Sequence, residues 1–167
     1  MVSIRHVERK DLDAIVLEPY SVTIEEPGDD LDRLTQLFDE TGFWLDDSGA
    51  VAIVDGDVLK GTIHFYRSGP CIHGYELGYV IHDRAEWGKG YASSGLRLLS
   101  DKLFEERPHV IRHQLTINCE NTASYKVAEK CGFMREGILR ASGFDDPPND
   151  AFVYSRIRDE IISANNS

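Results

Sequence analysis

The chain has 167 residues, of which 41% are hydrophobic, and a formal net charge of −11. This length supports one hydrophobic core and is short for two independent cores, so we expect a single domain over residues 1–167. The acidic excess argues against binding to nucleic acid or to an anionic membrane, and it favours a cationic partner.

The negative charge is concentrated near the N-terminus. Residues 8–47 contain thirteen Asp and Glu against three Lys and Arg, a pattern typical of a solvated surface or of an acidic rim around a binding site. We see no apolar run of membrane-spanning length and no secretory signal, so we expect a cytoplasmic protein. Cys71, Cys119 and Cys131 fit neither a disulfide framework nor a zinc pattern and are expected to be reduced.

Four elements are expected in the N-terminal third: a strand, an amphipathic helix that ends before Pro19, an acidic loop and a second helix. Their ranges are Ser3–Val7, Lys10–Leu17, Glu25–Asp32 and 30–40. Asp30 is the expected N-cap of the second helix, and Gly42 is its expected end.

From Ala50 onward the hydrophobic residues alternate with a period of two. This predicts a hairpin with strands Ala50–Val54 and Val58–Arg67, joined by the turn Asp55-Gly56-Asp57. A further strand is expected at Tyr75–His82. Antiparallel strands therefore dominate the first half of the sheet.

Strands and helices alternate in the second half. The expected ranges are a helix at Gly90–Glu105, a strand at His113–Asn118, a helix at Thr122–Lys130, and strands at Phe133–Leu139 and Ala151–Ile157. Strands first and helix crossovers later predict an α/β fold with three α/β/α layers and a mixed, mostly antiparallel sheet of about seven strands. Residues 163–167 are expected to form a frayed tail.

The most informative segment is Trp87-Gly88-Lys89-Gly90-Tyr91-Ala92, where a strand runs through two glycines directly into a helix. Backbone N–H groups at a helix N-terminus form an anion site, and the glycines permit close approach to them while Lys89 adds positive charge. Alone, the pattern also fits an ordinary tight turn. It lacks the spacing of the Walker A and dinucleotide-binding glycine motifs.

The longer segment around this loop resembles motif A of the GNAT superfamily of N-acetyltransferases, usually written Q/R-x-x-G-x-G/A. Trp87 stands at the first position, which removes one side-chain contact to phosphate. Four further blocks follow in the order of that family: Tyr75–His82, the strand ending at Ile117-Asn118, Asn121–Ser124 and Glu129–Phe133. The ending Phe133–Arg140, with the strand around Tyr154, is similar to the RimJ/RimL branch of ribosomal-protein N-terminal acetyltransferases.

The resemblance implies a GNAT-type sheet that is splayed at the site of acetyl-CoA, the cosubstrate. Acetyl-CoA would lie between the strands that end at His82 and Asn118, with its pantetheine amides bonded to backbone near Val80, Ile81 and His82. Its diphosphate would bind the amides of residues 88–92.

Three more residues receive roles from the resemblance. Trp87 would pack against the cofactor or the loop, and Asn118 and Asn121 would contact the pantetheine arm. Asn121 also stands where a helix N-cap is expected, which does not conflict with a cofactor contact.

Many members of the family carry, on the helix after Asn121, a tyrosine that protonates the departing CoA thiolate. Ala128 occupies that position in this sequence. Ser124 is therefore the expected hydrogen-bond donor to sulfur, as the corresponding serine is in the RimJ/RimL branch, and Tyr125 is the reserve candidate. A packing aromatic is the alternative for Tyr125.

An amine must lose a proton before it attacks a thioester, so a base is expected near the splay. Glu76 is the first choice, because its side chain shares a strand face with Gly78 and Val80. His64 on the preceding strand is the second. The alternatives are an exposed strand carboxylate for Glu76 and a core histidine for His64.

The sequence indicates an N-acetyltransferase that moves an acetyl group from acetyl-CoA to a primary amine by direct transfer, with an oxyanion stabilised by backbone N–H groups near Val80 and Ile81. The acceptor is expected to be a protein N-terminus, a polyamine or a cationic small molecule. Two alternatives remain: a non-catalytic acyl-CoA-binding or sensing module, which Ala128 favours, and a nucleotide-binding α/β domain. The histidines repeat no metal-ligand spacing, so no metal is expected. A homodimer is compatible with this branch.

Overall fold

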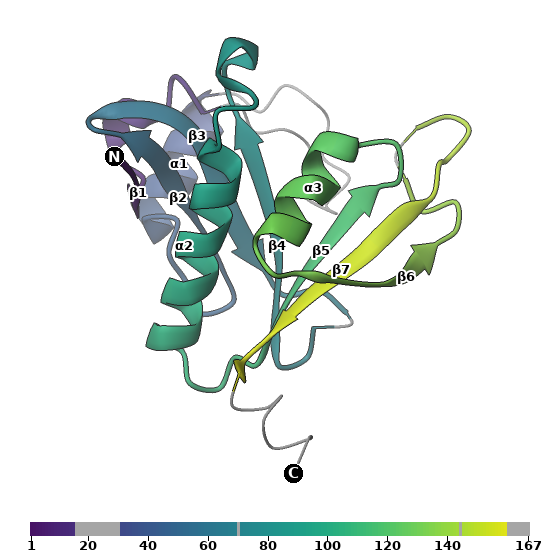
Figure 1. The fold of residues 1–167 in the computed structure, drawn as a ribbon. Coiled ribbons are helices and arrows are strands. Elements are labelled where there is room, and N and C mark those ends of the chain that lie inside the picture. The colour runs from purple at the N-terminus through teal and green to yellow at the C-terminus, as the bar shows by residue number, and fades with distance from the viewer. Residues whose placement is uncertain (16–30, 70, 144, 160–167) are drawn as a thin grey trace.

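A computed structural model describes residues 1–15, 31–69, 71–143 and 145–159. In this part of the chain, seven strands form one sheet in the order β1-β2-β3-β4-β5-β7-β6, and three α-helices pack against it (Figure 1). The elements are β1 Val2–His6, α1 Leu31–Thr41, β2 Ser48–Asp55, β3 Val58–Tyr66, β4 Gly74–Ile81, α2 Tyr91–Glu106, β5 Arg112–Asn118, α3 Thr122–Lys130, β6 Met134–Leu139 and β7 Ala151–Ile157.

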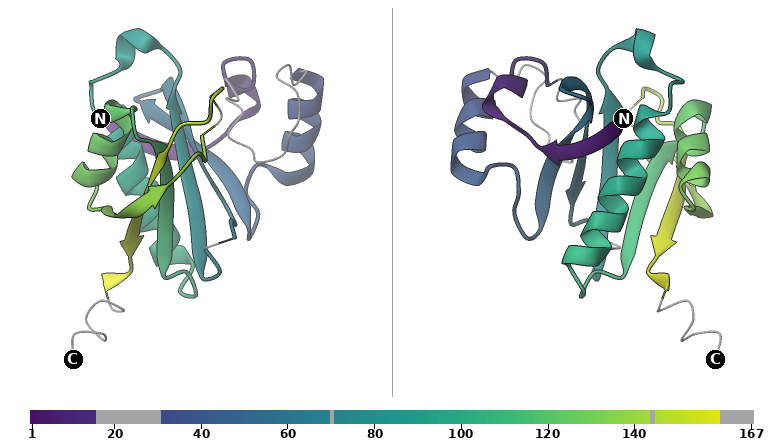
Figure 2. Two further views of the ribbon diagram at one scale, coloured as in Figure 1. Left: turned by 90° about the vertical axis from the view of Figure 1, so that its right-hand side faces the viewer. Right: turned by 60° about the vertical axis from the view of Figure 1, so that its left-hand side comes forward.

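The helices lie on both faces of the sheet. α2 and α3 cover one face and α1 lies on the other (Figure 2). Leu96, Leu99 and Leu103 of α2 are fully buried against the sheet, because their spacing places them on one side of the helix. A smaller cluster joins Leu34 of α1 to Val7. The expected three-layer α/β arrangement is thus confirmed.

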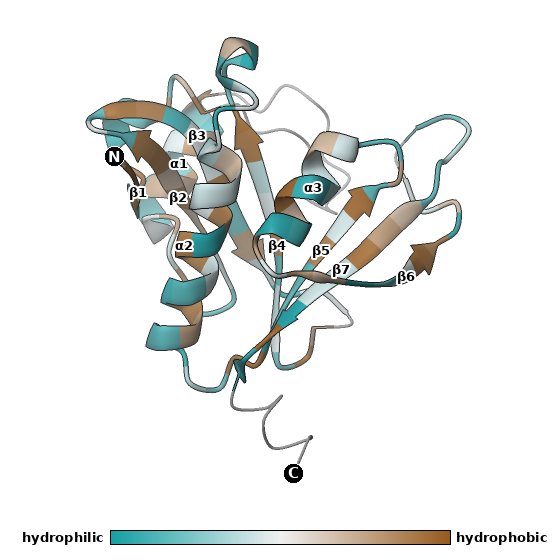
Figure 3. Ribbon diagram, viewed as in Figure 1, coloured by the Kyte–Doolittle hydropathy of each residue, from teal (hydrophilic) through white to brown (hydrophobic). Residues whose placement is uncertain are grey.

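Hydropathy follows these layers. Figure 3 shows apolar segments along the central strands and polar stretches on the outer sides of α2 and α3. Burial of each large aliphatic side chain between the layers stabilises the fold by about 1.5–3 kcal/mol. The sheet and α2 therefore form the rigid frame on which the loops at the strand ends are mounted.

The helix expected at Lys10–Leu17 is wrong in its described part. Arg9–Asp11 forms a short 3₁₀ turn instead, and the Asp11 carboxylate is buried. This carboxylate accepts the Glu8 N–H at 2.8 Å and two N–H groups of Arg5 at 2.6 and 2.9 Å. These local hydrogen bonds replace further helical turns.

The other expected elements are confirmed where the structure describes them, with small changes at their ends. Residues 16–30 hold most of the expected acidic loop and the expected cap Asp30, and they lie outside the described residues, as does the tail 163–167. Gly42 follows α1 with a φ of +59°, which is the left-handed conformation expected at a helix end.

β4 and β5 are neighbours over only part of their length. They pair in parallel from Gly74 and Arg112 to Glu76 and Gln114, and no further pair forms between the described residues of the two strands. β4 continues beside β3 as far as Ile81, and β5 continues beside β7 as far as Asn118. The two strands therefore separate in the middle of the sheet, and the gap opens toward the loop that precedes α2.

Candidate functional site

The loop before α2 presents backbone amides at the start of that helix. Gly88 and Gly90 have φ angles of +78° and +87°, in the left-handed region that favours glycine. Gly90 is the N-cap of α2, and its carbonyl accepts the N–H of Ser94 at 3.0 Å. The N–H groups of residues 91–93 precede Ser94, the first donor within the helix, so they point out of the helix end. Such a cluster of donors suits an anion.

Side-chain contacts of Trp87 and Lys89 fix the position of this loop. The indole N–H of Trp87 donates to the Ile81 carbonyl at 3.1 Å, and the Arg84 guanidinium lies 5.3 Å from the indole ring. Lys89 lies 3.1 Å from the Glu86 carboxylate. Trp87 thus ties the loop to the end of β4, while 57% of its surface stays exposed and open to a ligand.

A cavity of about 310 Å³ lies beside the first turn of α2. It is lined by Lys89, Gly90, Ser93, Ser94, Arg97 and Lys130. The Arg97 guanidinium donates to the Lys130 carbonyl at 2.8 Å, so cationic residues from two helices meet at one cavity. Sequence reasoning missed Arg97 and Lys130, because neither belongs to the glycine loop and only the packing of α3 beside α2 brings them to it.

Tyr91 and Ala92 serve this site through their backbone. The Tyr91 hydroxyl donates to Asp55 at 3.2 Å, and Lys60 lies 5.3 Å from the Tyr91 ring. The phenol is therefore directed to the hairpin of β2 and β3 rather than to the helix end. Ala92 is half-buried in the first turn.

The backbone of β4 faces the gap at alternate residues. His82 donates its N–H to the Lys60 carbonyl of the β3 side at 3.0 Å. Because bonding directions alternate along an antiparallel strand, Val80 also directs its backbone groups to β3, whereas Tyr79 and Ile81 direct theirs into the gap. Of the backbone groups expected to contact the cofactor, those of Ile81 therefore face the gap, together with those of Tyr79, and those of Val80 and His82 face β3; the Ile81 carbonyl also accepts the Trp87 indole N–H.

The side chain of His82 is also occupied. Its Nε2 lies 3.2 Å from the Thr62 hydroxyl, and burial lowers the pKa of the ring. A neutral imidazole held in this way fixes the end of β4 against β3. The loop thereby leaves the strand in a defined direction.

Two asparagines shape the turn from β5 into α3. Asn121 is the N-cap of α3, and its side chain accepts the Ser124 N–H at 3.1 Å, which confirms the expected cap. The Asn118 side chain accepts the Glu120 N–H at 2.9 Å and lies 3.4 Å from the Asp145 carboxylate. Asn118 is therefore engaged by its own turn and by a neighbouring loop.

Ser124 faces a tyrosine that sequence reasoning missed. The Tyr79 hydroxyl lies 2.8 Å from the Ser124 hydroxyl and 3.0 Å from the Ser124 carbonyl oxygen. Tyr125 turns away and packs its ring edge-on against Phe152, with the ring centroids 5.7 Å apart. Ala128 is fully buried. Ser124 and Tyr79 therefore form a pair of hydrogen-bonded hydroxyl groups at the start of α3.

Glu76 lies on the face of the sheet opposite α2 and α3, because its neighbours Tyr75 and Leu77 belong to the main core on the helix side. Only 5% of Glu76 is exposed, so the alternative of an exposed strand carboxylate is wrong. Its Oε2 accepts hydrogen bonds from the Gln114 amide at 2.7 Å and the Ser68 hydroxyl at 3.3 Å. The carboxylate is thus fixed where β4 and β5 begin to separate.

The hydrogen bonds around Glu76 extend to the edge of the sheet. Arg112 donates to the Gln114 side chain at 2.8 Å and to both oxygens of Glu136 at 2.8 and 2.7 Å. Ser155 donates to Glu136 at 2.6 Å. The Arg112 guanidinium lowers the pKa of Glu136 to about 2. This network links β4, β5, β6 and β7, which preorganises the face that carries Glu76.

His64 lies on the same face, directly beneath Gly78. A Cβ atom on Gly78 would lie 2.4 Å from His64 Nε2, so only glycine leaves room for the ring. The imidazole stacks on Tyr66, with the ring centroids 5.9 Å apart. Burial lowers the pKa of His64 to about 4. The ring is therefore neutral at pH 7 and is a weaker base than an unperturbed imidazole.

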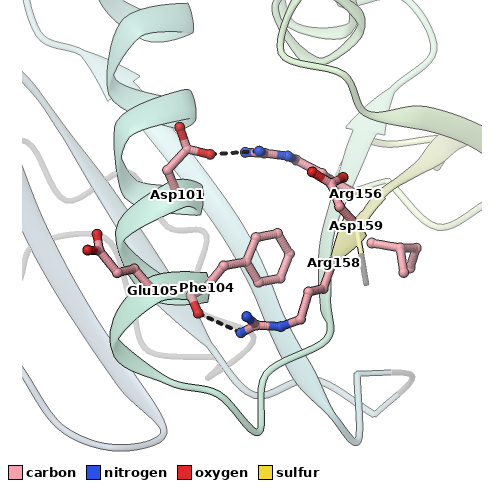
Figure 4. A pocket seen from close by; sticks show the side chains of 7 residues that line it. Asp101, Phe104, Glu105, Arg156, Arg158 and Asp159 are labelled. Carbon is pink, nitrogen blue, oxygen red and sulfur yellow. Dashed lines mark hydrogen bonds and ion pairs between the residues drawn. The ribbon is translucent and has the colours of Figure 1, made fainter. Parts of the chain in front are cut away.

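A second cavity, of about 270 Å³, lies at the other end of α2 (Figure 4). There Arg158 donates to the carbonyls of Phe104 and Arg107 at 2.6 and 3.0 Å, which satisfies the C-terminal end of the helix. Arg156 pairs with Asp101 at 2.6 Å. These contacts anchor the end of β7 to α2, so this cavity has a structural role.

Within the described ranges, no group of three or more His, Cys, Asp or Glu side chains could hold a metal ion. Of the helices in those ranges, none is long and apolar enough to cross a membrane. Cys71 and Cys131 are buried free thiols, and burial raises their pKa values, which disfavours the reactive thiolate.

A mixed sheet that opens between two parallel strands, beside a glycine-bounded helix start, defines an acyltransferase type of fold. Residues 2–134 match the family described as acetyltransferase (GNAT) domain. The chain therefore belongs to the GNAT acetyltransferase family, as its loop and block order predict.

Two curated proteins refine this placement. The chain is 36% identical over 93 residues to an uncharacterized N-acetyltransferase, YnaD, of Bacillus subtilis, covering 54% of this chain and 51% of that protein. It is 32% identical over 104 residues to the ribosomal-protein-serine acetyltransferase of Escherichia coli, covering 62% of this chain and 57% of that protein. The matched region thus spans about half the length of these relatives. The second match confirms the expected similarity to the RimL type.

A solved structure supports the same fold. The spermidine N-acetyltransferase from Vibrio cholerae, in complex with CoA and spermine, matches 96% of this chain and 98% of its own chain with a TM-score of 0.75. The sequence identity is 19%, so this similarity establishes the fold alone.

Proposed function

We propose that this protein is an acetyl-CoA-dependent N-acetyltransferase that transfers an acetyl group directly to a primary amine in a ternary complex. The observation that carries the proposal is the separation of β4 and β5 beside the amide cluster at the start of α2. Family membership supplies the reaction type. The gap and the amide cluster supply a place for an extended thioester with a phosphorylated end.

Acetyl-CoA fits the residues at both ends of this place. Its diphosphate would bind the backbone N–H groups at residues 88–92, where a Cβ on Gly88 would meet open space. Lys89, Arg97 and Lys130 line the adjacent cavity and would offset its negative charge. The pantetheine amides would bond to the groups that Tyr79 and Ile81 direct into the gap. Trp87 would cover the loop side of the ligand.

Glu76 would act as the base that removes a proton from the attacking amine through a water molecule. Its carboxylate is held by Gln114 and Ser68 on the sheet face opposite α2 and α3. A fixed base at the point where the strands part leaves the other face for CoA, so amine and thioester approach from opposite sides. His64 beneath Gly78 is the second candidate. Backbone N–H groups of the gap would stabilise the oxyanion.

The acceptor is proposed to be a cationic amine. The net charge of −11 favours such a partner electrostatically. The V. cholerae relative was solved with spermine, a polyamine, and the E. coli relative is an acetyltransferase of a ribosomal protein. A basic protein N-terminus, a polyamine or a cationic small molecule therefore forms the first substrate panel.

A thiol-release assay tests the proposal. The protein is mixed with acetyl-CoA and, in turn, with spermidine, basic N-terminal peptides and neutral amines of similar size. We expect release of free CoA thiol that depends on the amine, with higher kcat/KM for the cationic acceptors. Saturable binding of CoA without turnover would establish the alternative, a binding or sensing module. Higher kcat/KM for neutral amines would refute the acceptor class alone.

A further inference from the structure

Tyr79 connects β4 to α3 across the gap between the separated strands. Its ring packs against the main core on the helix side, and its hydroxyl reaches both the hydroxyl and the carbonyl oxygen of Ser124 at 2.8 and 3.0 Å. A phenol has one hydrogen to donate, so the pair has two arrangements: Tyr79 donates to the Ser124 carbonyl while accepting from the Ser124 hydroxyl, or Tyr79 donates to Ser124 Oγ. In one of them the Tyr79 proton points at Ser124 Oγ.

Both hydroxyls lie beyond the last paired residues of β4 and β5. Tyr79 follows Glu76, the final residue of β4 with a partner on β5. Ser124 lies in the first turn of α3, and its backbone N–H is held by Asn121 at 3.1 Å. Under the function proposed above, this is the region in which the thioester would be bound. With the thioester bound there, the pair would lie beside the bond that breaks.

The reaction needs a proton at this place. A thiol has an ordinary pKa near 8.5, a phenol has one near 10, and an aliphatic alcohol is a much weaker acid than either. Ser124 alone would have to become an alkoxide. The helix position at which the family resemblance places a tyrosine holds the buried Ala128, which has no proton to give.

We infer that Tyr79 supplies the proton that Ser124 delivers to the departing CoA thiolate, an inference that rests on the proposed acetyltransferase function. Tyr79 acts through Ser124 and is thus a positioning residue and proton source. Tyr79 on β4 then supplies the proton that the family resemblance assigns to a tyrosine at the helix position of Ala128.

The step balances as follows in atoms and electrons. When the C–S bond of the tetrahedral intermediate breaks, its electron pair stays on sulfur. The Ser124 Oγ–H bond breaks and an S–H bond forms, while the Tyr79 O–H bond breaks and its proton reforms the Ser124 hydroxyl. The phenolate of Tyr79 then takes from solvent a proton equivalent to the one that the amine loses on forming the amide.

Steady-state kinetics of Tyr79→Phe, Ser124→Ala and the double variant test this relay. Assays use acetyl-CoA with spermidine and with a basic N-terminal peptide, over a range of pH. Tyr79→Phe keeps the packed ring, so we expect its KM for acetyl-CoA to change less than about twofold and its kcat to fall about a hundredfold. The pH profile of kcat should lose its basic limb. The kcat of the double variant should lie within about twofold of the kcat of Ser124→Ala, because removing either member of a pair that acts as a unit already removes its effect.

Tyr154→Phe is the matched control. It also removes the hydroxyl of a buried tyrosine, one that donates to Glu129 at 2.9 Å, and wild-type kcat is expected. A Tyr79→Phe enzyme with normal kcat and an unchanged pH profile would overturn the relay while leaving the acetyltransferase function intact. A change in KM alone would also overturn it, by showing a packing role. If the wild-type protein releases no CoA thiol with either acceptor, the proposed function fails and the relay fails with it.

Discussion

Acidification from about pH 7 to about pH 4.5 is expected to destabilise the fold by about 3 kcal/mol through one side chain, His113. This histidine has no exposed surface. Its Nδ1 lies 2.8 Å from the Ser100 hydroxyl, its ring stacks on Phe104 at 4.0 Å between centroids, and its buried Nε2 has no hydrogen-bond partner among the described residues. Burial, with smaller contributions from Arg156 and Arg158, lowers the pKa of His113 to about 3.

The sign follows from the two protonation states. In the unfolded chain the imidazole has its ordinary pKa of about 6.5, so it binds a proton below that pH while the native ring stays neutral. The contribution of His113 to stability is full above about pH 6.5 and is lost as the pH falls toward 3. Two pH units below 6.5, at about 1.4 kcal/mol each, give the value of about 3 kcal/mol.

Urea denaturation of the wild type and of His113→Gln at both pH values measures this contribution. Between the two pH values, the free energy of unfolding should fall by about 3 kcal/mol less in the variant than in the wild type. His64 and the carboxylates titrate in both proteins, so their contributions cancel in the comparison. Equal losses in the two proteins would refute the assignment of acid sensitivity to His113.

Three further outcomes are expected. Gly90→Glu should abolish acetyl-CoA binding in calorimetry, because it places a negative charge at the amide cluster. Gly90→Ala has the same backbone strain at φ +87° without the charge, so it should bind acetyl-CoA more tightly than the glutamate variant does. Equal affinity of the two variants would contradict the placement of the diphosphate. Glu76→Gln keeps a partner for Gln114 and should lower kcat at least about a hundredfold with little change in acetyl-CoA affinity; a normal rate would transfer the role of base to His64 or to solvent. Arg158→Lys should lose the two hydrogen bonds to the end of α2, which lowers the free energy of unfolding by about 2 kcal/mol. We expect a fall in Tm of about 6 °C by circular dichroism. An unchanged Tm would argue against a capping role.

Sequence patterns were sufficient where the determining residues are close together in the chain. The bounds of α3 follow from the cap at Asn121 and from Gly132 after its end, which has a φ of +81°. The loop before α2 follows from two glycines at a strand-to-helix junction. The face of β4 that carries Glu76 follows from strand alternation.

The remaining features depend on contacts between distant residues. The contact of Tyr79 with Ser124 joins residues 45 positions apart, and a one-dimensional pattern does not show that a side chain of β4 reaches the start of α3. The orientation of Ile81 and His82 depends on the pairing register with β3. The expected helix after Lys10 failed because helical spacing does not reveal that Arg5 binds the Asp11 carboxylate.

Because β4 and β5 separate, part of each strand lies beside a gap at the centre of the sheet, as strands normally do only at the edge of a sheet. A ligand bound in that gap would make backbone hydrogen bonds of the kind that a neighbouring strand makes. At a ligand concentration a hundred times its Kd, such occupancy adds about 2.7 kcal/mol to the stability of the folded chain. Supply of the thioester would then govern how long the protein survives in the cell as well as how fast it works.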